Sequence, residues 1–578
     1  MHPFAHECRG SIVLLDNTVY GPPLQNSQRA PGPAKYLFGS LVSTLRSNLA
    51  SAAPARGRQV FEVTEWVISF SLVMYAVFAP HSIAMTQGSY LIGLAAWGVQ
   101  LAATRNLKHK RTPVDIALFG FFACCVVSSF LSYDPLVSIK GLKSPAFFLA
   151  FYFVSNNVKS IRFAGFLALA MIVSCLVNVG YSGVKLAIGR GLQIESIQVD
   201  SPLANESIRS GDVIIAADDT VVNSQEDLTR IIDSQRGRLR LKIQRKEAIA
   251  ETSIPRQAIK EANGVGFERL GITTSPGRNF RITGFYSHYE TYAEVLQLIA
   301  ALLIGMLISL PDKGSRLAWF LAGVIPLLAV TLILTSTRAA LAGLATGVAM
   351  MALASSSRRV VLAAVASVVI VLPMALVTVE HARGISVFDP EEGSTAYRLE
   401  IWREAFGIIK DHPLFGIGKG SEAKLKQSLG LYDEGRLPPG HFHSTPVQIA
   451  VWWGLPGLIF YCSFMAIFVI ETWRLIKLVK LHKRWQLYGI ALGGLGAAVA
   501  FDVSSLVHFN FGDGEVVMAI WLLTGLTFAV RRIAETRDVV TTERISVPPS
   551  PDSSDRNQLL EQATAFEQSA RVAKAKQN

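Results

Sequence analysis

Apolar residues in this 578-residue chain are gathered into long runs that short polar stretches separate. Many runs extend over roughly 20 residues, the length that a helix needs to cross a hydrocarbon layer about 30 Å thick. We therefore predict a polytopic α-helical membrane protein with about twelve transmembrane helices. The expected spans are 64–80, 87–104, 114–132, 144–156, 162–188, 289–310, 317–334, 338–354, 359–379, 447–472, 487–507 and 515–531.

Composition and charge agree with this pattern. Half of the residues are apolar and 17% are charged, whereas soluble domains carry about 25% charged residues. A single soluble fold and a disordered chain are therefore excluded. The net charge of +12 would suggest nucleic-acid binding in a soluble protein. In a membrane protein it reflects the Lys and Arg residues of cytoplasmic loops, so nucleic acid is not an expected partner.

Basic short loops alternate along the chain with short loops that lack Lys and Arg. This alternation predicts the orientation of the chain in the membrane. The loops 105–111 and 474–484 are basic, whereas 81–86 and 508–514 hold no Lys or Arg. The positive-inside rule then places both termini in the cytoplasm. The domain boundaries that follow are a flexible tail (1–63), spans 1–5 (64–188), an extracytoplasmic insert (189–256), a connector with spans 6–9 (257–379), a large extracytoplasmic loop (380–446), spans 10–12 (447–532) and a polar cytoplasmic tail (533–578).

The insert has the alternation of a small α/β domain. A strand-like run at 213–217 precedes a turn, and Ser224 can cap a helix with Asp227 at the capping-box position. An alternating strand follows at 238–244. Together with Ser201–Ala204 and Ile208–Ile214, this order resembles a bacterial PDZ domain. The resemblance implies a protein partner bound at the insert, and a purely structural cap is the alternative.

Conspicuous motifs lie around the second outer segment. Arg398 is followed four residues later by Trp402, His412-Pro413 leads into Gly416 and Gly418, and His443-Ser444 precedes Gln448 at the start of a span. Arg338 opens an earlier span after Thr335-Ser336-Thr337, and Arg281 to His288 precede another. These pieces resemble the O-antigen ligase and O-antigen polymerase superfamily of bacterial membrane glycosyltransferases. This chain departs from the family pattern at Ser444, where the family has an Asn.

The resemblance implies transfer of a glycan from undecaprenyl diphosphate to an acceptor hydroxyl on lipid A–core, outside the bacterial inner membrane. It implies catalytic roles for His443, Arg338 and Arg398, and substrate binding by Arg281, His288 and Ser444. The chemistry fits, because guanidinium groups bind phosphate bidentately and imidazole is a base near neutral pH. No Asp-rich or Cys/His metal motif occurs in the sequence, so we expect metal-independent transfer with no cofactor.

Other functions remain open. A polymerase of the same superfamily would use a growing glycan as acceptor, and a third type glycosylates protein. Gly180-Tyr181-Ser182-Gly183 fits the short motif around an intramembrane serine protease nucleophile, and a non-enzymatic membrane scaffold is the last alternative. If the protein is a transferase, we expect Arg338, Arg398 and His443 to converge on one outward-facing cavity.

Overall fold

The computed structural model describes most of the chain between residues 55 and 546. Residues 1–54 of the expected 1–63 tail, parts of the expected 380–446 loop (384–392, 426–430 and 432–439) and residues 547–578 of the expected 533–578 tail lie outside the described residues. The described ranges are 55–104, 111–204, 206, 208–234, 237–245, 248–278, 280–355, 357–366, 369–370, 372–383, 393–425, 431, 440–481 and 484–546.

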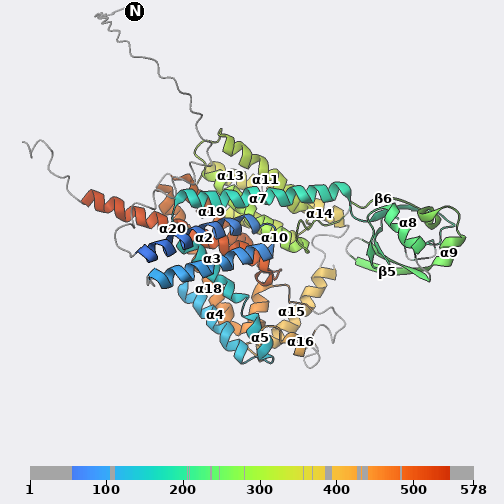
Figure 1. The fold of residues 1–578 in the computed structure, drawn as a ribbon, viewed down its shortest axis with the longest axis horizontal. Helices are drawn as coiled ribbons and strands as arrows, with labels where there is room; N and C mark the ends of the chain where they lie inside the picture. Colours follow the sequence, from blue (N-terminus) through green and yellow to red (C-terminus); the bar gives the residue numbers. More distant parts are fainter. Residues whose placement is uncertain are drawn as a thin grey trace, which may run out of the picture. The chain divides into compact units, whose positions relative to one another are not determined.

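Helices dominate the described part of the chain (Figure 1), in keeping with its apolar runs. They are α2 (Ala55–Phe78), α3 (Ile83–Thr104), α4 (Asp115–Phe130), α5 (Pro135–Gly141), α6 (Leu149–Asn157), α7 (Ile161–Ile188), α8 (Gln225–Ser234), α9 (Arg256–Glu261), α10 (Tyr289–Ser309), α11 (Arg316–Leu334), α12 (Arg338–Ser355), α13 (Arg358–Ala366), α14 (Leu372–Arg383), α15 (Gly393–Asp411), α16 (Glu422–Leu425), α18 (Thr445–Leu481), α19 (Trp485–Ser505) and α20 (Gly514–Ser546).

Among the described residues, nine helical segments are long and apolar enough to cross a membrane. A polytopic membrane protein is thus supported, while the count of twelve spans stays a prediction. The expected spans at 87–104, 114–132 and 359–379 are not among the nine: α3 is diluted by polar residues, α4 has 16 residues, and the third is divided between α13 and α14. The nine segments are 59–78, 135–157, 161–188, 289–309, 316–334, 338–355, 445–480, 485–505 and 514–536.

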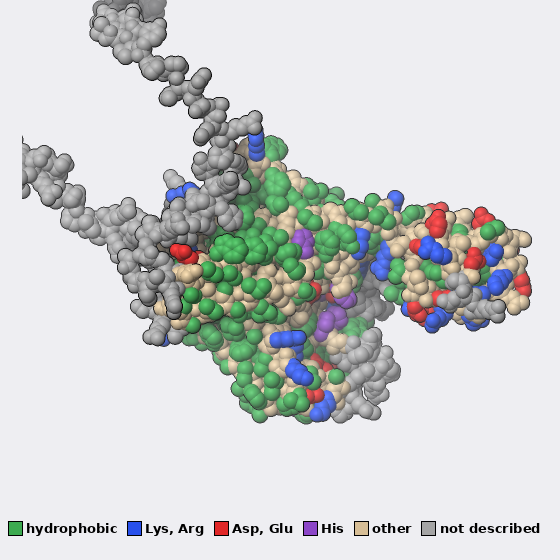
Figure 2. Space-filling view, viewed as in Figure 1, with side chains coloured by type: hydrophobic (Ala, Val, Ile, Leu, Met, Phe, Trp, Pro, Cys, Tyr) green, Lys and Arg blue, Asp and Glu red, His purple; other side chains and the backbone are tan. Residues whose placement is uncertain are grey.

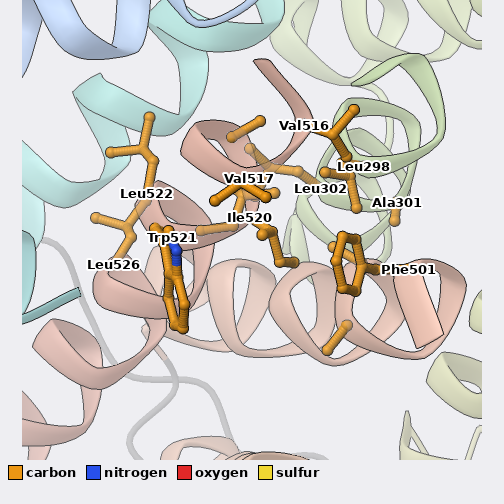
Figure 3. Close-up of a cluster of buried hydrophobic side chains, with 14 of the residues drawn as sticks. Leu298, Ala301, Leu302, Phe501, Val516, Val517, Ile520, Trp521, Leu522 and Leu526 are labelled. Carbon is orange, nitrogen blue, oxygen red and sulfur yellow. The ribbon is translucent and has the colours of Figure 1, made fainter. Parts of the chain in front are cut away.

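Three helices, α10, α19 and α20, form the centre of the helical part. Figure 3 shows Leu298 and Leu302 of α10, Phe501 of α19 and Ile520 of α20 in one buried apolar cluster. Glycines bring α10 and α19 into close contact, because a Cβ on Gly493 would meet the backbone of Leu302. This packing holds the polar residues at the ends of α10 and α19 in a defined relative position.

Helix α18 is broken at Gly454, which has φ of +74°. The turn between α15 and α16 fills the break: the amide of Ile417 donates to the carbonyl of Val451 at 2.9 Å, and the amide of Leu455 donates to the carbonyl of Pro413 at 2.7 Å. A side chain at Gly454 would collide with Leu414, so glycine is required there. The break therefore fixes α15 against the start of α18.

The second part of the structure is an antiparallel sheet with the order β5-β4-β2-β1-β6, and β3 pairs with β2. Its strands are β1 (Leu192–Ile197), β2 (Val213–Ala217), β3 (Thr220–Val221), β4 (Arg238–Arg245), β5 (Ala248–Pro255) and β6 (Ile272–Pro276). On the visible face, charged side chains are dense over this part, whereas hydrophobic side chains cover much of the helical part (Figure 2). The sheet has its own core, which includes Ile194, Ile214 and Leu241.

The sheet continues beyond the expected boundary at residue 256. Strand β6 pairs with β1, with Gln193 opposite Ser275, and Gln225 of α8 donates to the Thr274 hydroxyl at 3.1 Å. The segment from 257 to 276 therefore belongs to the insert rather than to the connector. Since β6 also takes the outer edge of β1, any strand added at that edge has to displace it.

Deleting residues 192–276 and joining Gly191 to Gly277 is expected to leave the helical part folded. The two ends already lie together, because the Gly277 amide donates to the Gly191 carbonyl at 3.1 Å and the sheet has a separate core. The variant should elute as a single symmetric peak in size-exclusion chromatography, and it should retain the helical circular dichroism signal of the full chain. Deleting only 238–255 exposes the rest of that core and serves as the control that should aggregate. Aggregation of the first variant would contradict an independent module.

Candidate functional site

Two carboxylates, Glu290 and Glu294, lie one turn apart at the start of α10. The Glu294 side chain is 2% exposed and accepts hydrogen bonds from Ser504 at 2.7 Å and from Gln297. Asn510 donates to the same oxygen at 3.4 Å. Buried carboxylates are costly unless they are hydrogen-bonded, so this network anchors the start of α10 to the end of α19.

His508 connects the two carboxylates. Its Nδ1 lies 2.8 Å from Oε1 of Glu294, and its Nε2 lies 3.8 Å from Oε1 of Glu290. Burial disfavours the imidazolium, but the hydrogen bond with Glu294 and the charge of Glu290 outweigh it and raise the pKa of His508. The His508 carbonyl accepts from the amide and hydroxyl of Thr445 at 3.0 and 3.2 Å, which ties the start of α18 to the same cluster.

His443 lies two residues before α18, in a strained backbone conformation with φ of +47°. Its amide donates to Nδ1 of His441 at 3.2 Å, and the two rings are in contact, tilted by 58° with centroids 4.2 Å apart. Burial, together with the neighbouring His441, lowers the pKa of His443 to about 4. The imidazole is therefore neutral at pH 7. Its Nδ1 is buried and has no hydrogen-bond partner within the described part of the chain.

The loop that carries His443 is held on both sides by side chains. Phe442 donates its amide to Gln448 at 2.8 Å, and its carbonyl accepts from the indole of Trp402 at 2.7 Å. Gln448 in turn donates to Glu422 at 3.0 Å. These contacts use Trp402 and Gln448, two residues of the sequence motifs, and they orient His443 rather than taking part in chemistry themselves.

Arg398 lies on α15 with its side chain 18% exposed, and its Nη2 is 4.0 Å from Oε1 of Glu290. Burial is the main cause of the low pKa of His443. The positive charges of Arg398 and His508 lower this pKa further, and the negative charge of Glu290 opposes them. The structure therefore brings Arg398 and His443, which are 45 positions apart in the sequence, into one cluster with Glu290 and His508. We call these four residues with His441 and Glu294 the α10 cluster.

Arg338 is the first residue of α12 and lies two positions after Ser336, which has φ of +55°. Glycines let α12 pack closely on its neighbours: a Cβ on Gly343 would meet Gln297 of α10 and Ala500 of α19. Because Arg338 precedes Gly343 by about one and a half turns, it lies at the same end of these helices as the α10 cluster.

The remaining expected site residues have different environments. The guanidinium of Arg281 lies 4.2 Å from the centre of the Tyr289 ring, next to Glu290. His288 is exposed at the N-cap of α10. Ser444 is buried, and its hydroxyl accepts from the Val447 amide at 3.5 Å. Ser444 therefore lies within the first turn leading into α18, where it contributes to the local backbone.

Sequence reasoning missed Glu290, Glu294 and His508. A signal was present, since charged residues within a membrane span are rare, paired and often functional, and Glu290 and Glu294 fall inside the expected span 289–310. His508 lay in a loop singled out only for its lack of Lys and Arg. Nothing in the local sequence pairs it with carboxylates more than 200 positions away.

The serine of the protease alternative is engaged elsewhere. Ser182 is buried in α7, and its hydroxyl lies within hydrogen-bond distance of the Asn178 carbonyl at 2.9 Å and the Tyr292 hydroxyl at 3.0 Å. These partners belong to helix packing and include no base. This geometry favours a structural role for Ser182.

Comparison with known protein families gives a match over part of the chain. No curated protein matches the chain. Residues 322–462 match the family model described as O-Antigen ligase, and this range contains Arg338, Arg398 and His443. Glu290, Glu294 and His508 lie outside the matched range. The match shows that this segment is similar to O-antigen ligases, which supports a glycosyltransferase function of the ligase or polymerase type.

Proposed function

We propose that this protein is an O-antigen ligase-like glycosyltransferase that moves a glycan from undecaprenyl diphosphate to a hydroxyl of lipid A–core. The observation that carries the proposal is the α10 cluster. It unites a neutral, strained imidazole at His443 with the guanidinium of Arg398, and both residues belong to the segment that resembles the family. An imidazole base beside a diphosphate-binding arginine is what this reaction needs.

In the proposed reaction, neutral His443 takes the proton from the acceptor hydroxyl. The hydroxyl oxygen forms a bond to the anomeric carbon from the face opposite the carrier. The bond from that carbon to the diphosphate oxygen breaks, the carrier diphosphate leaves with the electron pair, and the anomeric configuration is inverted. Arg338 and Arg398 neutralise the charge that develops on the diphosphate, and Arg281 and His288 bind substrate. The proposed contribution of Ser444, which is buried, to substrate binding is to hold the loop that carries His443. The proposed transfer uses no metal ion.

Glu290 has two consequences for this reaction. Its negative charge favours the protonated form of His443, so it would stabilise the imidazolium that the reaction forms. The 4.0 Å between Oε1 of Glu290 and Nη2 of Arg398 is longer than the nitrogen–oxygen distance of a strong ion pair. The Glu290 carboxylate nevertheless keeps the Arg398 side chain near the site.

The proposed location is the bacterial inner membrane, with both termini in the cytoplasm and the insert and the 380–446 loop outside. The positions of charged residues support this orientation. Gly514 packs close to Ile83, so the two loops without Lys or Arg adjoin each other. In contrast, Arg532 donates to the Ser155 carbonyl at 3.1 Å, near Lys159 in the sequence. Basic residues thus gather at the other ends of the helices.

A polymerase that extends a carrier-linked glycan is the second candidate, because the same residues would catalyse both reactions. The PDZ-like insert is proposed as a site for a protein partner. The position of β6 on the outer edge of β1 argues that capture by strand addition there requires displacement of β6.

The test is transfer by purified protein from a carrier-linked labelled glycan. Lipid A–core and a second carrier-linked glycan are offered as separate acceptors, with and without a chelator. Label on lipid A–core supports the ligase, and label on longer carrier-linked glycan supports the polymerase. Activity that chelation abolishes and a divalent metal restores would contradict the metal-independent scheme, and no transfer to either acceptor would contradict the function.

Replacing Arg398 with lysine is expected to raise the KM for the carrier about tenfold, because a charge remains but the bidentate fork is lost. Arg398→Ala should have a larger effect. Arg403, on the same helix but exposed and paired with Glu400, is the matched control, and Arg403→Lys should change little. An unchanged KM in Arg398→Ala would remove Arg398 from carrier recognition.

A further inference from the structure

A cavity of about 390 Å³ lies where the end of α7 meets the connector that leads to α10. Lys185 and Gly189 come from the end of α7, Arg190 and Asn223 from the insert, and Arg281 from the connector. The volume is within the range of small-ligand sites. It would hold a phosphate group with part of a sugar, and it is too small for a glycan chain.

The walls of this cavity are built by specific contacts. Asn178 of α7 accepts from the amide of Phe285 at 3.0 Å, and Tyr181 stacks on Phe285 with ring centroids 4.3 Å apart. The amide of Ile282 donates to the carbonyl of Leu334 at 3.3 Å. The connector is therefore held against α7 and the end of α11, so the cavity has fixed sides.

The chemistry of the lining is cationic. Lys185, Arg190 and Arg281 contribute three positive charges, and no Asp or Glu is among the described residues that line the cavity. Lys185 lies 4.9 Å from the centre of the Tyr181 ring, and Arg281 stacks on Tyr289. Hydroxyl and amide groups of Thr283, Ser287 and Asn223 supply neutral hydrogen bonds. Such a set suits a phosphate oxyanion.

We propose that this cavity binds a phosphate group on the sugar headgroup of the acceptor lipid. The inference rests on the proposed transfer, since it assigns the acceptor's chemistry. Arg281 lies between the cavity and the α10 cluster. It lines the cavity, and its guanidinium lies over the ring of Tyr289, which directly precedes Glu290 of the cluster. A headgroup held there by its phosphate would present its hydroxyl toward that cluster.

The test compares phosphorylated acceptor with the same acceptor after phosphatase treatment. Lys185→Gln and Arg190→Gln combined should raise the KM for the phosphorylated acceptor about tenfold with kcat unchanged. The KM for the dephosphorylated acceptor should be the same in variant and wild type. Arg209→Gln, an exposed arginine of the insert outside the cavity, is the matched control. Equal KM values for both acceptors in the wild type would overturn the proposal.

Binding is measured separately in nanodiscs of zwitterionic lipid, so that the site and the reaction are judged independently. Retained, phosphate-dependent acceptor binding without any transfer would contradict the proposed function but support the cavity. Full competition by inorganic phosphate at low concentration, or by phosphatidylglycerol in the disc, would show an anion or membrane-lipid site and overturn the assignment to the acceptor.

Discussion

Replacing His443 with alanine is expected to slow glycan transfer by about 10²–10⁴-fold, the usual contribution of a general base. Binding of the carrier should persist, because Arg398 and Arg338 remain. The measurements are single-turnover transfer and carrier affinity on the same preparation. His441→Ala is the matched control, since it removes the neighbouring imidazole ring and should slow transfer less. Full activity in His443→Ala would remove its role as base.

The same residue predicts the pH dependence. Burial lowers the pKa of His443 to about 4, so the base stays deprotonated as the pH falls from 7 to about 5. The value of kcat/KM should then be constant over that window and should decrease below it, since kcat/KM reports the free enzyme. A bound diphosphate favours the imidazolium, so the acid limb of kcat should lie at higher pH. An acid limb that persists in His443→Ala would contradict the assignment.

Replacing Glu294 with alanine is expected to destabilise the protein by about 3–5 kcal/mol, as for other broken buried pairs. The change leaves His508, Ser504 and Asn510 without their shared acceptor, and it detaches the start of α10 from the end of α19. Thermal unfolding in detergent, followed by tryptophan fluorescence, should show a markedly lower transition.

Glu294→Gln preserves the shape and one acceptor oxygen, so its unfolding transition should lie between those of the alanine variant and the wild type. Glu290→Gln is the control on the same helix, because Glu290 is more exposed and has longer contacts. It should leave stability nearly unchanged. A Glu294→Ala protein as stable as the wild type would contradict the anchoring role of the buried network.

The sequence by itself determined the class of the protein and the residues of its main motif. Apolar runs of about 20 residues have few alternatives to a membrane helix, because every backbone polar group must be satisfied within the bilayer. Arg398 with Trp402, and His443 with Gln448, were recognisable because the spacing within each pair is local. The strands and the capped helix of the insert were readable for the same reason, since alternation and capping act over a few residues.

The tertiary structure decided what depends on contacts between distant segments. Glu290 and His508 join His443 and Arg398 only because glycines let α10 and α19 pack closely. The insert extends to Pro276 because β6 pairs with β1 some 80 positions earlier, and its own short sequence does not specify that partner. Local patterns follow from backbone geometry and burial, whereas a shared site follows from long-range packing that no single segment encodes.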